Sequence, residues 1–155
     1  NNEWLYAITE NAGSIVFFDF DNVAGTLAHN ETISALPAAF PAADAKGGSE
    51  IEIAPGGKFL YVSNRLDPAK KGILGAYSIS EVDGKLTPID HYETGGSTPR
   101  HFSLSPNGEL LVVGNQTSAN MSVFKVDTTD GTLTLVETTD TCEFPFFARM
   151  AVSAE

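Results

Sequence analysis

Several residue types are scarce in this chain of 155 residues, and each scarcity narrows what the protein can be. Cys142 is the one cysteine, so an internal disulfide framework is excluded. Apolar runs stay well short of the ~20 residues that span a bilayer as a helix, so we expect no membrane partner. Nine basic residues against twenty acidic ones give a net charge of −11. A charge of that sign argues against a nucleic-acid partner, which needs a basic patch.

Signatures of cofactor sites are missing as well. Asp19, Asp21 and Asn22 cluster on one expected turn, yet no EF-hand-like loop or His/Cys ligand spacing accompanies them. A glycine-rich nucleotide loop is absent too. We therefore expect no metal and no other cofactor. A small anionic substrate is compatible with the acidic composition, because a pocket needs only one or two local arginines. We expect a cytoplasmic protein, with secretion left open.

The sequence does contain a repeat. Residues 49–65 read Ser-Glu-Ile-Glu-Ile-Ala-Pro-Gly-Gly-Lys-Phe-Leu-Tyr-Val-Ser-Asn-Arg, which is an apolar strand, a turn, a second apolar strand and a polar end. The pattern returns in residues 101–116, and its second half stands at residues 3–10. Three copies of one unit predict a repeat architecture.

Each full copy predicts four strands. Helical periodicity is missing throughout, so the chain is expected to be all-β. The fourth strand of each unit is the most polar, which is typical of a β-propeller blade whose outermost strand faces water. A β-sandwich is the rival, but sandwiches do not repeat their turns at a fixed period. The expected strands are residues 4–8, 15–20, 26–33, 50–53, 59–63, 73–79, 86–92, 102–104, 110–113, 121–126, 133–137 and 146–152.

The units divide the chain into about three blades of antiparallel strands. We expect an incomplete blade, a long connection, two full blades and the opening strand of a further blade, at residues 1–33, 34–48, 49–95, 96–140 and 141–155. Propellers need at least about four blades to close. The chain is therefore expected to be part of a larger propeller, and the remaining blades are expected to be its partners.

The motifs resemble those of the lactonase family of seven-bladed propellers. That family includes 6-phosphogluconolactonases and carboxymuconate lactonizing enzymes. The resemblance rests on residues 49–65, on Gly-Ser-Thr-Pro-Arg-His-Phe-Ser-Leu-Ser-Pro-Asn-Gly at 96–108 and on Gly-Asn-Gln-Thr-Ser-Ala-Asn-Met-Ser-Val-Phe at 114–124. Their order fits the C-terminal half of the family.

Aligning the three copies on their second strands places Glu10, Arg65 and Gln116 in one column. Each stands where an apolar strand gives way to a loop, so all three are expected at one end of the propeller. Sheets stack about 10 Å apart, which lets a Glu and an Arg side chain of adjacent blades meet. The resemblance implies that Glu10 is the acid or base and that Arg65 stabilises an anion. A structural ion pair at the rim of the channel is the alternative.

A second column holds Ser49 and Arg100, with Glu50 opposite His101, where the first strand of each blade approaches the channel. Arg100 lies in a Pro-Arg motif like that of a family arginine from another blade. We assign Arg100, His101 and Gln116 to substrate binding. For His101 the alternative is an ordinary hydrogen-bonded strand residue.

The distribution of arginines modestly supports a role for Arg65 and Arg100 in the site. There are only three arginines in the chain, Arg65, Arg100 and Arg149, and two of them hold repeat-defined positions.

The resemblance implies an enzyme that opens or forms a lactone ring in a small anionic substrate, such as a sugar lactone or a carboxymuconate. A non-catalytic propeller that binds a protein or a ligand is the alternative. We expect this chain by itself to be inactive, because other blades supply half of the family's site.

Overall fold

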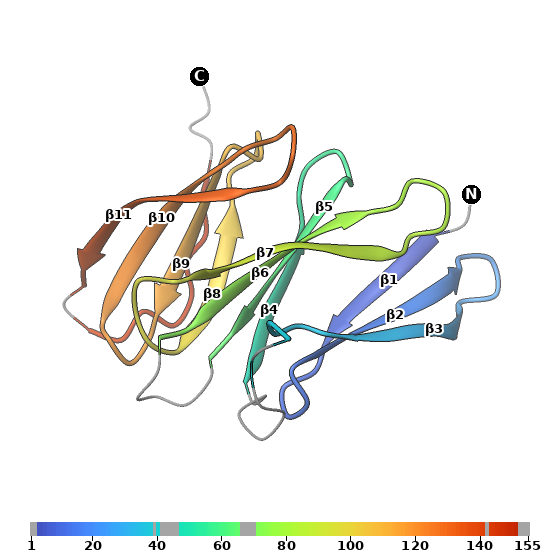
Figure 1. Ribbon diagram of the computed structural model, residues 1–155, viewed down its shortest axis with the longest axis horizontal. Coiled ribbons are helices and arrows are strands. Elements are labelled where there is room, and N and C mark those ends of the chain that lie inside the picture. Colours follow the sequence, from blue (N-terminus) through green and yellow to red (C-terminus); the bar gives the residue numbers. More distant parts are fainter. Residues whose placement is uncertain (1–2, 39, 41–46, 66–70, 142, 152–155) are drawn as a thin grey trace.

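The computed structural model describes residues 3–38, 40, 47–65, 71–141 and 143–151, and folds them into three antiparallel sheets that fan out side by side (Figure 1). The prediction of an all-β chain built from propeller blades is confirmed. The described residues contain no helix that is long and apolar enough to cross a membrane.

Each sheet follows the order of the chain from one edge to the other. The first sheet comprises β1 (Glu3–Ile8), β2 (Ser14–Asp21) and β3 (Thr26–Ser34). The second comprises β4 (Gly48–Ile53), β5 (Phe59–Asn64), β6 (Ile73–Ile79) and β7 (Leu86–Glu93). The third comprises β8 (Pro99–Leu104), β9 (Leu110–Asn115), β10 (Asn120–Val126) and β11 (Leu133–Asp140). Residues 66–70, and residues 39 and 41–46 of the connection expected at 34–48, lie outside the described residues.

In the second sheet, burial is greatest in the middle strands β5 and β6 and lowest in the outer strand β7. Every residue of β5 is buried, whereas β11 is exposed at every position after Leu133. A strand covered on both faces reads as a continuous apolar run, and one that faces water is polar. The sequence pattern of each blade therefore follows from the position of its strands.

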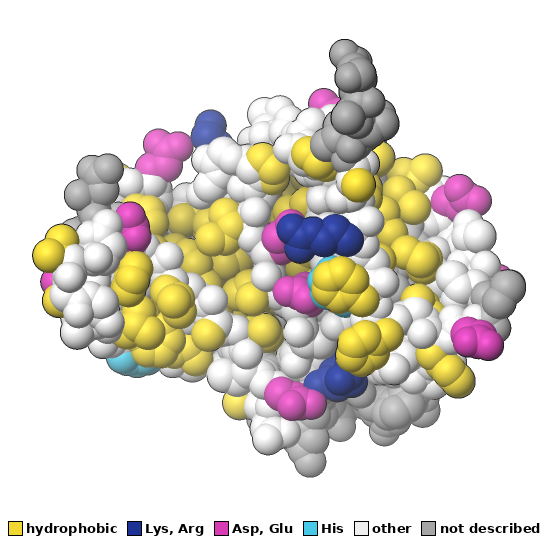
Figure 2. Space-filling model, turned by 180° about the vertical axis from the view of Figure 1, so that it is seen from behind, with side chains coloured by type: hydrophobic (Ala, Val, Ile, Leu, Met, Phe, Trp, Pro, Cys, Tyr) yellow, Lys and Arg dark blue, Asp and Glu magenta, His cyan; other side chains and the backbone are white. Residues whose placement is uncertain are grey.

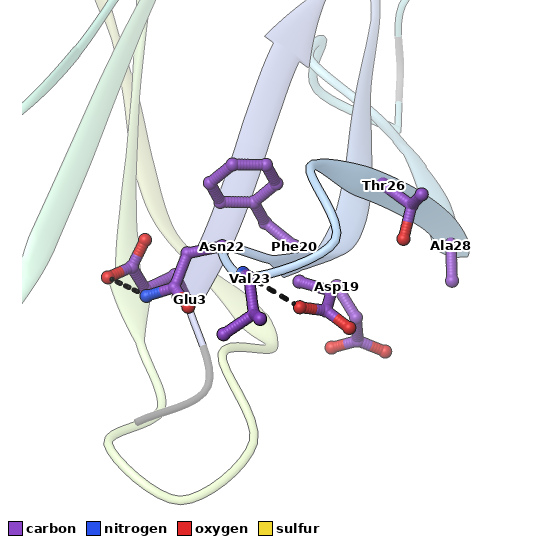
Figure 3. Close-up of a pocket in the computed structure, with 8 residues that line it drawn as sticks. Glu3, Asp19, Phe20, Asn22, Val23, Thr26 and Ala28 are labelled. Atoms are coloured by element: carbon purple, nitrogen blue, oxygen red, sulfur yellow. Dashed lines mark hydrogen bonds between the residues drawn. The ribbon is translucent and has the colours of Figure 1, made fainter.

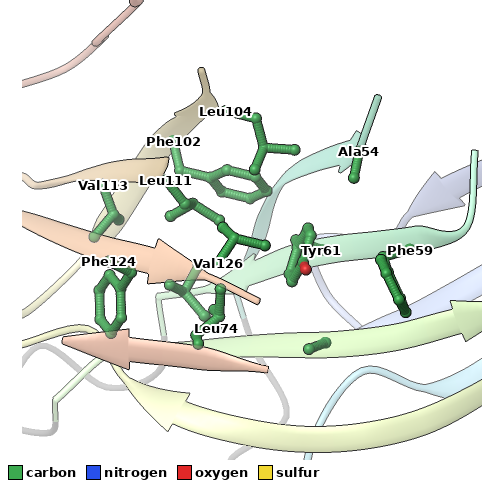
Figure 4. Packing of buried hydrophobic residues seen from close by; sticks show 12 residues of the cluster. Ala54, Phe59, Tyr61, Leu74, Phe102, Leu104, Leu111, Val113, Phe124 and Val126 are labelled. Carbon is green, nitrogen blue, oxygen red and sulfur yellow. The ribbon is translucent and has the colours of Figure 1, made fainter. Parts of the chain in front are cut away.

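The core lies between the sheets. The larger apolar cluster joins the second and third sheets through Tyr61 and Leu74 on one side and Phe102 and Phe124 on the other (Figure 4). A second cluster joins the first and second sheets. Stability comes from packing one sheet face against the next, since burial of apolar area is the main favourable term in folding.

The first strands of the two complete sheets contain matching β-bulges. The register shifts between Gly48 and Glu50 in β4, and between Pro99 and His101 in β8. The extra residues are therefore Ser49 and Arg100, which the repeat had placed in one column. Pairing continues past the bulges, so β8 begins at Pro99 rather than at the predicted residue 102. Bulges re-aim side chains and are common beside active sites.

The predicted strand at 146–152 is not formed in its described part, residues 146–151. This segment lies on the face of the third sheet: a Cβ on Gly114 would be 3.4 Å from Pro145, and the Ala148 amide donates to His101 Nδ1 at 3.4 Å. A sheet face offers side chains rather than free backbone groups. The segment therefore packs without forming a ladder of strand hydrogen bonds.

Replacement of Phe124 tests the core between the second and third sheets. Phe124 is 1% exposed, so Phe124→Ala should lower the free energy of unfolding by about 3–5 kcal/mol through lost burial and the cavity left behind. Phe144 is 65% exposed, so Phe144→Ala should change it by less than about 0.5 kcal/mol. Urea denaturation of both variants measures the difference. Equal losses would show that the core does not lie between these sheets.

Candidate active site

Three of the predicted site residues share one cavity. Its volume is about 310 Å³, and its lining residues are Ile8, Glu10, Gly48, Ser49, Arg65 and Arg100. These residues come from the ends of β1 and β5 and from the bulged starts of β4 and β8. The cavity therefore draws on all three sheets, at the end of the fan where the repeat placed its first column.

Backbone contacts fix the cavity between the first two sheets. The amide of Gly47 donates to the carbonyl of Glu10 at 2.6 Å, and the amide of Arg65 donates to the carbonyl of Gly47 at 2.8 Å. A Cβ on Gly48 would be 2.5 Å from the Thr9 carbonyl oxygen. Only glycine permits that approach, so Gly48 lets the end of β1 reach the beginning of β4.

Glu10 and Arg65 form a hydrogen-bonded ion pair across the two sheets through Arg65 Nη2 and Glu10 Oε1. Arg65 Nε also donates to the Gly47 carbonyl at 3.3 Å. The Arg65 side chain is 17% exposed and that of Glu10 is 67% exposed. The guanidinium is thus held in place by the protein, while the carboxylate has room to contact a ligand or a water.

The charge state of Glu10 follows from this pairing. The Arg65 guanidinium, by its hydrogen bond and its charge, holds the pKa of the Glu10 carboxyl below its ordinary value, and Arg100 adds a smaller effect in the same direction. A group with a lowered carboxyl pKa is ionised at neutral pH. In this arrangement Glu10 is suited to accept a proton or orient a water, and poorly suited to donate a proton.

Arg100 reaches the cavity because of how β8 is attached to β4. Ser49 Oγ donates to the Pro99 carbonyl at 2.6 Å and lies 2.9 Å from Ser63 Oγ. The hydroxyl therefore ties the two bulges together directly beside Arg100. The Arg100 guanidinium also lies over the ring of Phe146, with its Cζ 4.8 Å from the centroid, a cation–π contact that restricts its orientation.

His101 takes part in a neighbouring cluster and does not line this cavity. Its Nε2 lies 3.2 Å from Glu50 Oε2, its Nδ1 accepts from the Ala148 amide, and its ring packs on Phe147 at 4.0 Å between centroids. Both ring nitrogens thus have protein partners. Its assignment to substrate binding stays a prediction. Figure 2 shows basic, acidic, histidine and apolar side chains close together on this face of the molecule.

Glu52 lies two residues after Glu50 in β4 and contacts the third sheet. Its Oε2 accepts from the Leu104 amide at 3.0 Å, so it links adjacent sheets. Burial raises the pKa of the Glu52 carboxyl, and this effect is opposed by the hydrogen bond from Leu104 and the charge of Arg149. The contacts of Glu52 are those of a structural link.

Gln116 is not brought to the cavity. It occupies the third position of its column as predicted, and its amide donates to the Thr98 carbonyl at 2.8 Å, as that of Arg65 does to Gly47. Because Gln116 follows β9 in the third sheet, it lies one blade farther along the fan. A substrate-orienting role for Gln116 stays a prediction.

Sequence reasoning did not assign Ser49 and Phe146 to the site. Ser49 could have been found, because it holds the same place in its repeat as Arg100. Phe146 gave no such signal, because it follows the last complete unit and contacts Arg100 only in the folded chain. Among the residues that the structure describes, no cluster of three or more His, Cys, Asp or Glu side chains could hold a metal ion.

Comparison with known proteins shows the family of this chain. The family described as "Lactonase, 7-bladed beta-propeller" matches residues 1–149. The chain therefore belongs to the lactonase family of seven-bladed β-propellers.

Its relatives include sugar lactonases. A 6-phosphogluconolactonase of Formosa agariphila is 35% identical over 133 residues, which cover 86% of this chain and 36% of that protein. A 6-phosphogluconolactonase of Bacillus subtilis is 27% identical over 143 residues, which cover 92% of this chain and 39% of that protein. This chain therefore spans less than two fifths of the length of these relatives.

Solved structures of other proteins are similar to the fold of this chain. The Pseudomonas aeruginosa periplasmic gluconolactonase superposes with a TM-score of 0.79 at 26% identity, over 89% of this chain and 37% of that one. A protein from Lactobacillus plantarum superposes with a TM-score of 0.81 at 28% identity, over 91% of this chain and 39% of that one.

Carboxyl titration tests the electrostatics of the cavity. Arg65→Met removes the largest cause of the low Glu10 pKa, so the midpoint should rise toward the ordinary carboxyl value. Arg100→Met should raise it less, because Arg100 acts only through its charge. NMR of the Glu10 carboxyl carbon measures both shifts. An unchanged midpoint in Arg65→Met would contradict the ion pair.

Proposed function

We propose that the full-length protein hydrolyses a small anionic sugar lactone, and that the cavity at Glu10, Arg65 and Arg100 supplies part of its active site. The observation that carries the proposal is one ionised carboxylate next to two guanidinium groups in a cavity of about 310 Å³. Membership of the lactonase family supports it. The names of the relatives point to sugar lactones as the substrate class.

Lactone hydrolysis has two requirements that these residues match. Water must add to the ring carbonyl carbon, which moves negative charge onto the carbonyl oxygen. The bond from that carbon to the ring oxygen then breaks, and the ring oxygen leaves as a hydroxyl. Glu10 in its ionised form would take the proton of the attacking water and release it to solvent, and solvent water would protonate the departing ring oxygen. Arg65, held by Gly47 and Glu10, would donate to the developing oxyanion.

Arg100 has a separate task in this proposal. It lies in a bulge and lines the same cavity as the Glu10–Arg65 pair. A guanidinium binds a carboxylate or a phosphate with two parallel hydrogen bonds. We therefore assign Arg100 to the anionic group of the substrate, which would place the lactone carbonyl between Arg65 and Glu10.

Cycloisomerisation of a carboxymuconate is the second reaction to test, because the same polar groups could stabilise its carboxylates. The low pKa of Glu10 favours hydrolysis: a base that activates water must be ionised, whereas ring formation on a muconate ends with a proton delivered to carbon. Turnover of carboxymuconate with no turnover of sugar lactones would reverse this assignment.

Substitutions at the ion pair test the catalytic roles in the full-length protein. Arg65→Ala should lower kcat/KM for 6-phosphogluconolactone about 10²–10³-fold, which is typical for the loss of an oxyanion donor. Glu10→Gln should lower it about 10²–10⁴-fold, because an amide cannot take the proton. The rates are followed by acid release in a pH-stat.

The matched control is Lys71→Ala. Lys71 also forms an ion pair between side chains, with Glu93 at 2.6 Å, but both side chains are about two thirds exposed and neither lines the cavity. Its kcat/KM should stay within about twofold of the parent, since exposed pairs contribute little. If Arg65→Ala and Glu10→Gln behave like this control, the site has been placed wrongly.

Substrate selectivity tests the role of Arg100. Arg100→Ala should raise the KM for 6-phosphogluconolactone much more than the KM for unphosphorylated gluconolactone, because only the phosphorylated substrate loses a contact between its phosphate and Arg100. A ratio of about tenfold corresponds to roughly 1.4 kcal/mol, within the range of a charge-assisted hydrogen bond. Equal effects on both substrates would assign Arg100 to the lactone ring itself.

A further inference from the structure

A buried asparagine ends the second strand of each complete sheet. Asn64 is the last residue of β5 and Asn115 is the last residue of β9, and both are fully buried. They stand directly before Arg65 and Gln116, so the repeat places them at equivalent positions. A fully buried amide side chain lowers stability unless its polar atoms are hydrogen bonded. The contacts of these two residues therefore show what they do.

Each asparagine joins its own sheet to the preceding one. Asn64 Nδ2 donates to the Ala35 carbonyl at 3.1 Å, and Asn115 Nδ2 donates to the Thr94 carbonyl at 3.1 Å. Ala35 and Thr94 follow the last strands of their sheets, β3 and β7, and both are fully buried. A carbonyl can only accept a hydrogen bond, so the partner also fixes the orientation of each amide. The same buried link between sheets thus occurs twice.

The other polar atom of each amide makes no hydrogen bond. Oδ1 of Asn64 and Oδ1 of Asn115 are buried without a partner among the residues that the structure describes. A buried acceptor left without a partner lowers stability. The two side chains consequently contribute to the fold through their donors. For Asn64 that donor bonds one atom, the Ala35 carbonyl oxygen.

The link made by Asn64 lies beside the candidate active site. Asn64 pairs in register with Gly48, which lines the cavity. Its side chain binds Ala35 of the first sheet in the interior. The next residue, Arg65, binds Glu10 of the same sheet at the cavity. The interior bond therefore fixes the end of β5 against the first sheet one residue before Arg65.

The equivalent residues of the other two sheets do not have this position. Asn115 is followed by Gln116, which does not line the cavity. In the first sheet the position belongs to Thr9, whose Oγ1 accepts from the amide of Ser14 at 3.0 Å. That bond joins β1 to β2 within one sheet. Within the described ranges, Asn64 thus makes the link between sheets that lies next to a residue of the site.

A larger hollow at the turn between β2 and β3 offers no alternative site for an anionic substrate. Its volume is about 580 Å³, and Figure 3 shows Glu3, Asp19 and Asn22 among its lining residues. Asp21 also lines it, whereas no basic residue of the described chain does. Like charges repel, so an anion is expected in the smaller cavity, where the position of Arg65 matters.

We propose that Asn64 is a positioning residue of the active site: its hydrogen bond to the Ala35 carbonyl holds Arg65 where it meets Glu10 and the substrate. The backbone position of an arginine limits where its guanidinium can lie. A displacement of about 1 Å at a catalytic group can lower a rate about 10²-fold. The placement of Arg65 stands on geometry alone, whereas its consequence for the reaction rests on the proposed function.

Replacement of Asn64 by leucine tests the proposal in the full-length protein. Leucine has a similar volume and no donor, so Asn64→Leu removes the link and leaves the charged residues in place. The kcat for 6-phosphogluconolactone should fall about 10–100-fold, while its KM stays within about twofold because Arg100 is unchanged. The midpoint of the Glu10 carboxyl titration should rise toward the ordinary value, since the hydrogen bond from Arg65 is the main cause of the low pKa.

Asn115→Leu is the matched control. It makes the same substitution at the equivalent position of the third sheet, where Gln116 is the following residue. Asn115 Nδ2 also lies 2.9 Å from Asn120 Oδ1, so this control loses at least as many hydrogen bonds, and its melting temperature should fall at least as far. Its kcat, its KM and the midpoint of Glu10 should equal those of the parent. A role in stability alone would not separate the two variants.

The titration tests the position of Arg65 whatever the reaction is. An unchanged Glu10 midpoint in Asn64→Leu overturns the proposal, and so does an equal rise in Asn115→Leu, which would show a general loosening of the sheets. A raised midpoint with an unchanged kcat supports the positioning and contradicts the catalytic roles proposed for Glu10 and Arg65. Failure of the positioning is therefore distinct from failure of the proposed function.

Asn64→Thr takes the place of Asn64→Leu if the leucine variant does not fold. Threonine holds the equivalent position in the first sheet, as Thr9, so the end of a second strand accommodates it. Its hydroxyl is one bond closer to the backbone than the amide nitrogen and falls short of the Ala35 carbonyl. The same rise of the Glu10 midpoint is expected, with Asn115→Thr as the control, and an unchanged midpoint overturns the proposal.

Discussion

The packing of one sheet face against the next is the interaction on which this structure depends. The apolar residues of the second sheet are buried with the help of its neighbours: Leu60 and Val62 pack in a cluster shared with the first sheet, and Tyr61 and Leu74 in one shared with the third. Because the cores lie between blades, the blades hold their relative positions through the same contacts that stabilise them. The polar groups at the ends of the blades are therefore held in fixed positions relative to one another. This is why Glu10 and Arg65, 55 residues apart, meet as an ion pair.

The site uses the repeat and departs from it. Equivalent positions fall at the same end of each of the three sheets, which makes a row of candidate residues available along that side of the fan. Chemistry requires the members of that row to differ. The column Glu10, Arg65 and Gln116 offers a carboxylate, a guanidinium and an amide at one structural position. The two bulges likewise place different side chains at one structural position: the Ser49 hydroxyl joins adjacent blades, and the Arg100 cation lines the cavity.

The sequence was sufficient for most of the architecture and for the meeting of Glu10 and Arg65 as an ion pair. The predicted strand boundaries lie close to the observed ones because hydrophobic alternation and turn residues are local properties of the sequence. The repeat also allowed the boundaries in one unit to be compared with those in the others. Two predictions failed for non-local reasons. The strand expected at 146–152 packs on a sheet face, and the start of β8 was placed late because a bulge has no simple periodicity. The contacts of His101 with Phe147 and Ala148 were equally beyond sequence reasoning, since these residues approach it from the segment after the last complete unit.

By itself the sequence determined the blade, its family and the columns of equivalent residues, because each of these is a pattern along the chain. The tertiary structure decided which members of a column touch, which carboxylate is held ionised and which sheet face is left uncovered. Those properties depend on distances between segments that alternation and spacing do not encode. Gly25 shows the division clearly: the sequence marks it as a turn glycine, and only the packed sheets show that Gly84 and Gly131 lie beneath aromatic rings, while no residue that the structure describes covers Gly25.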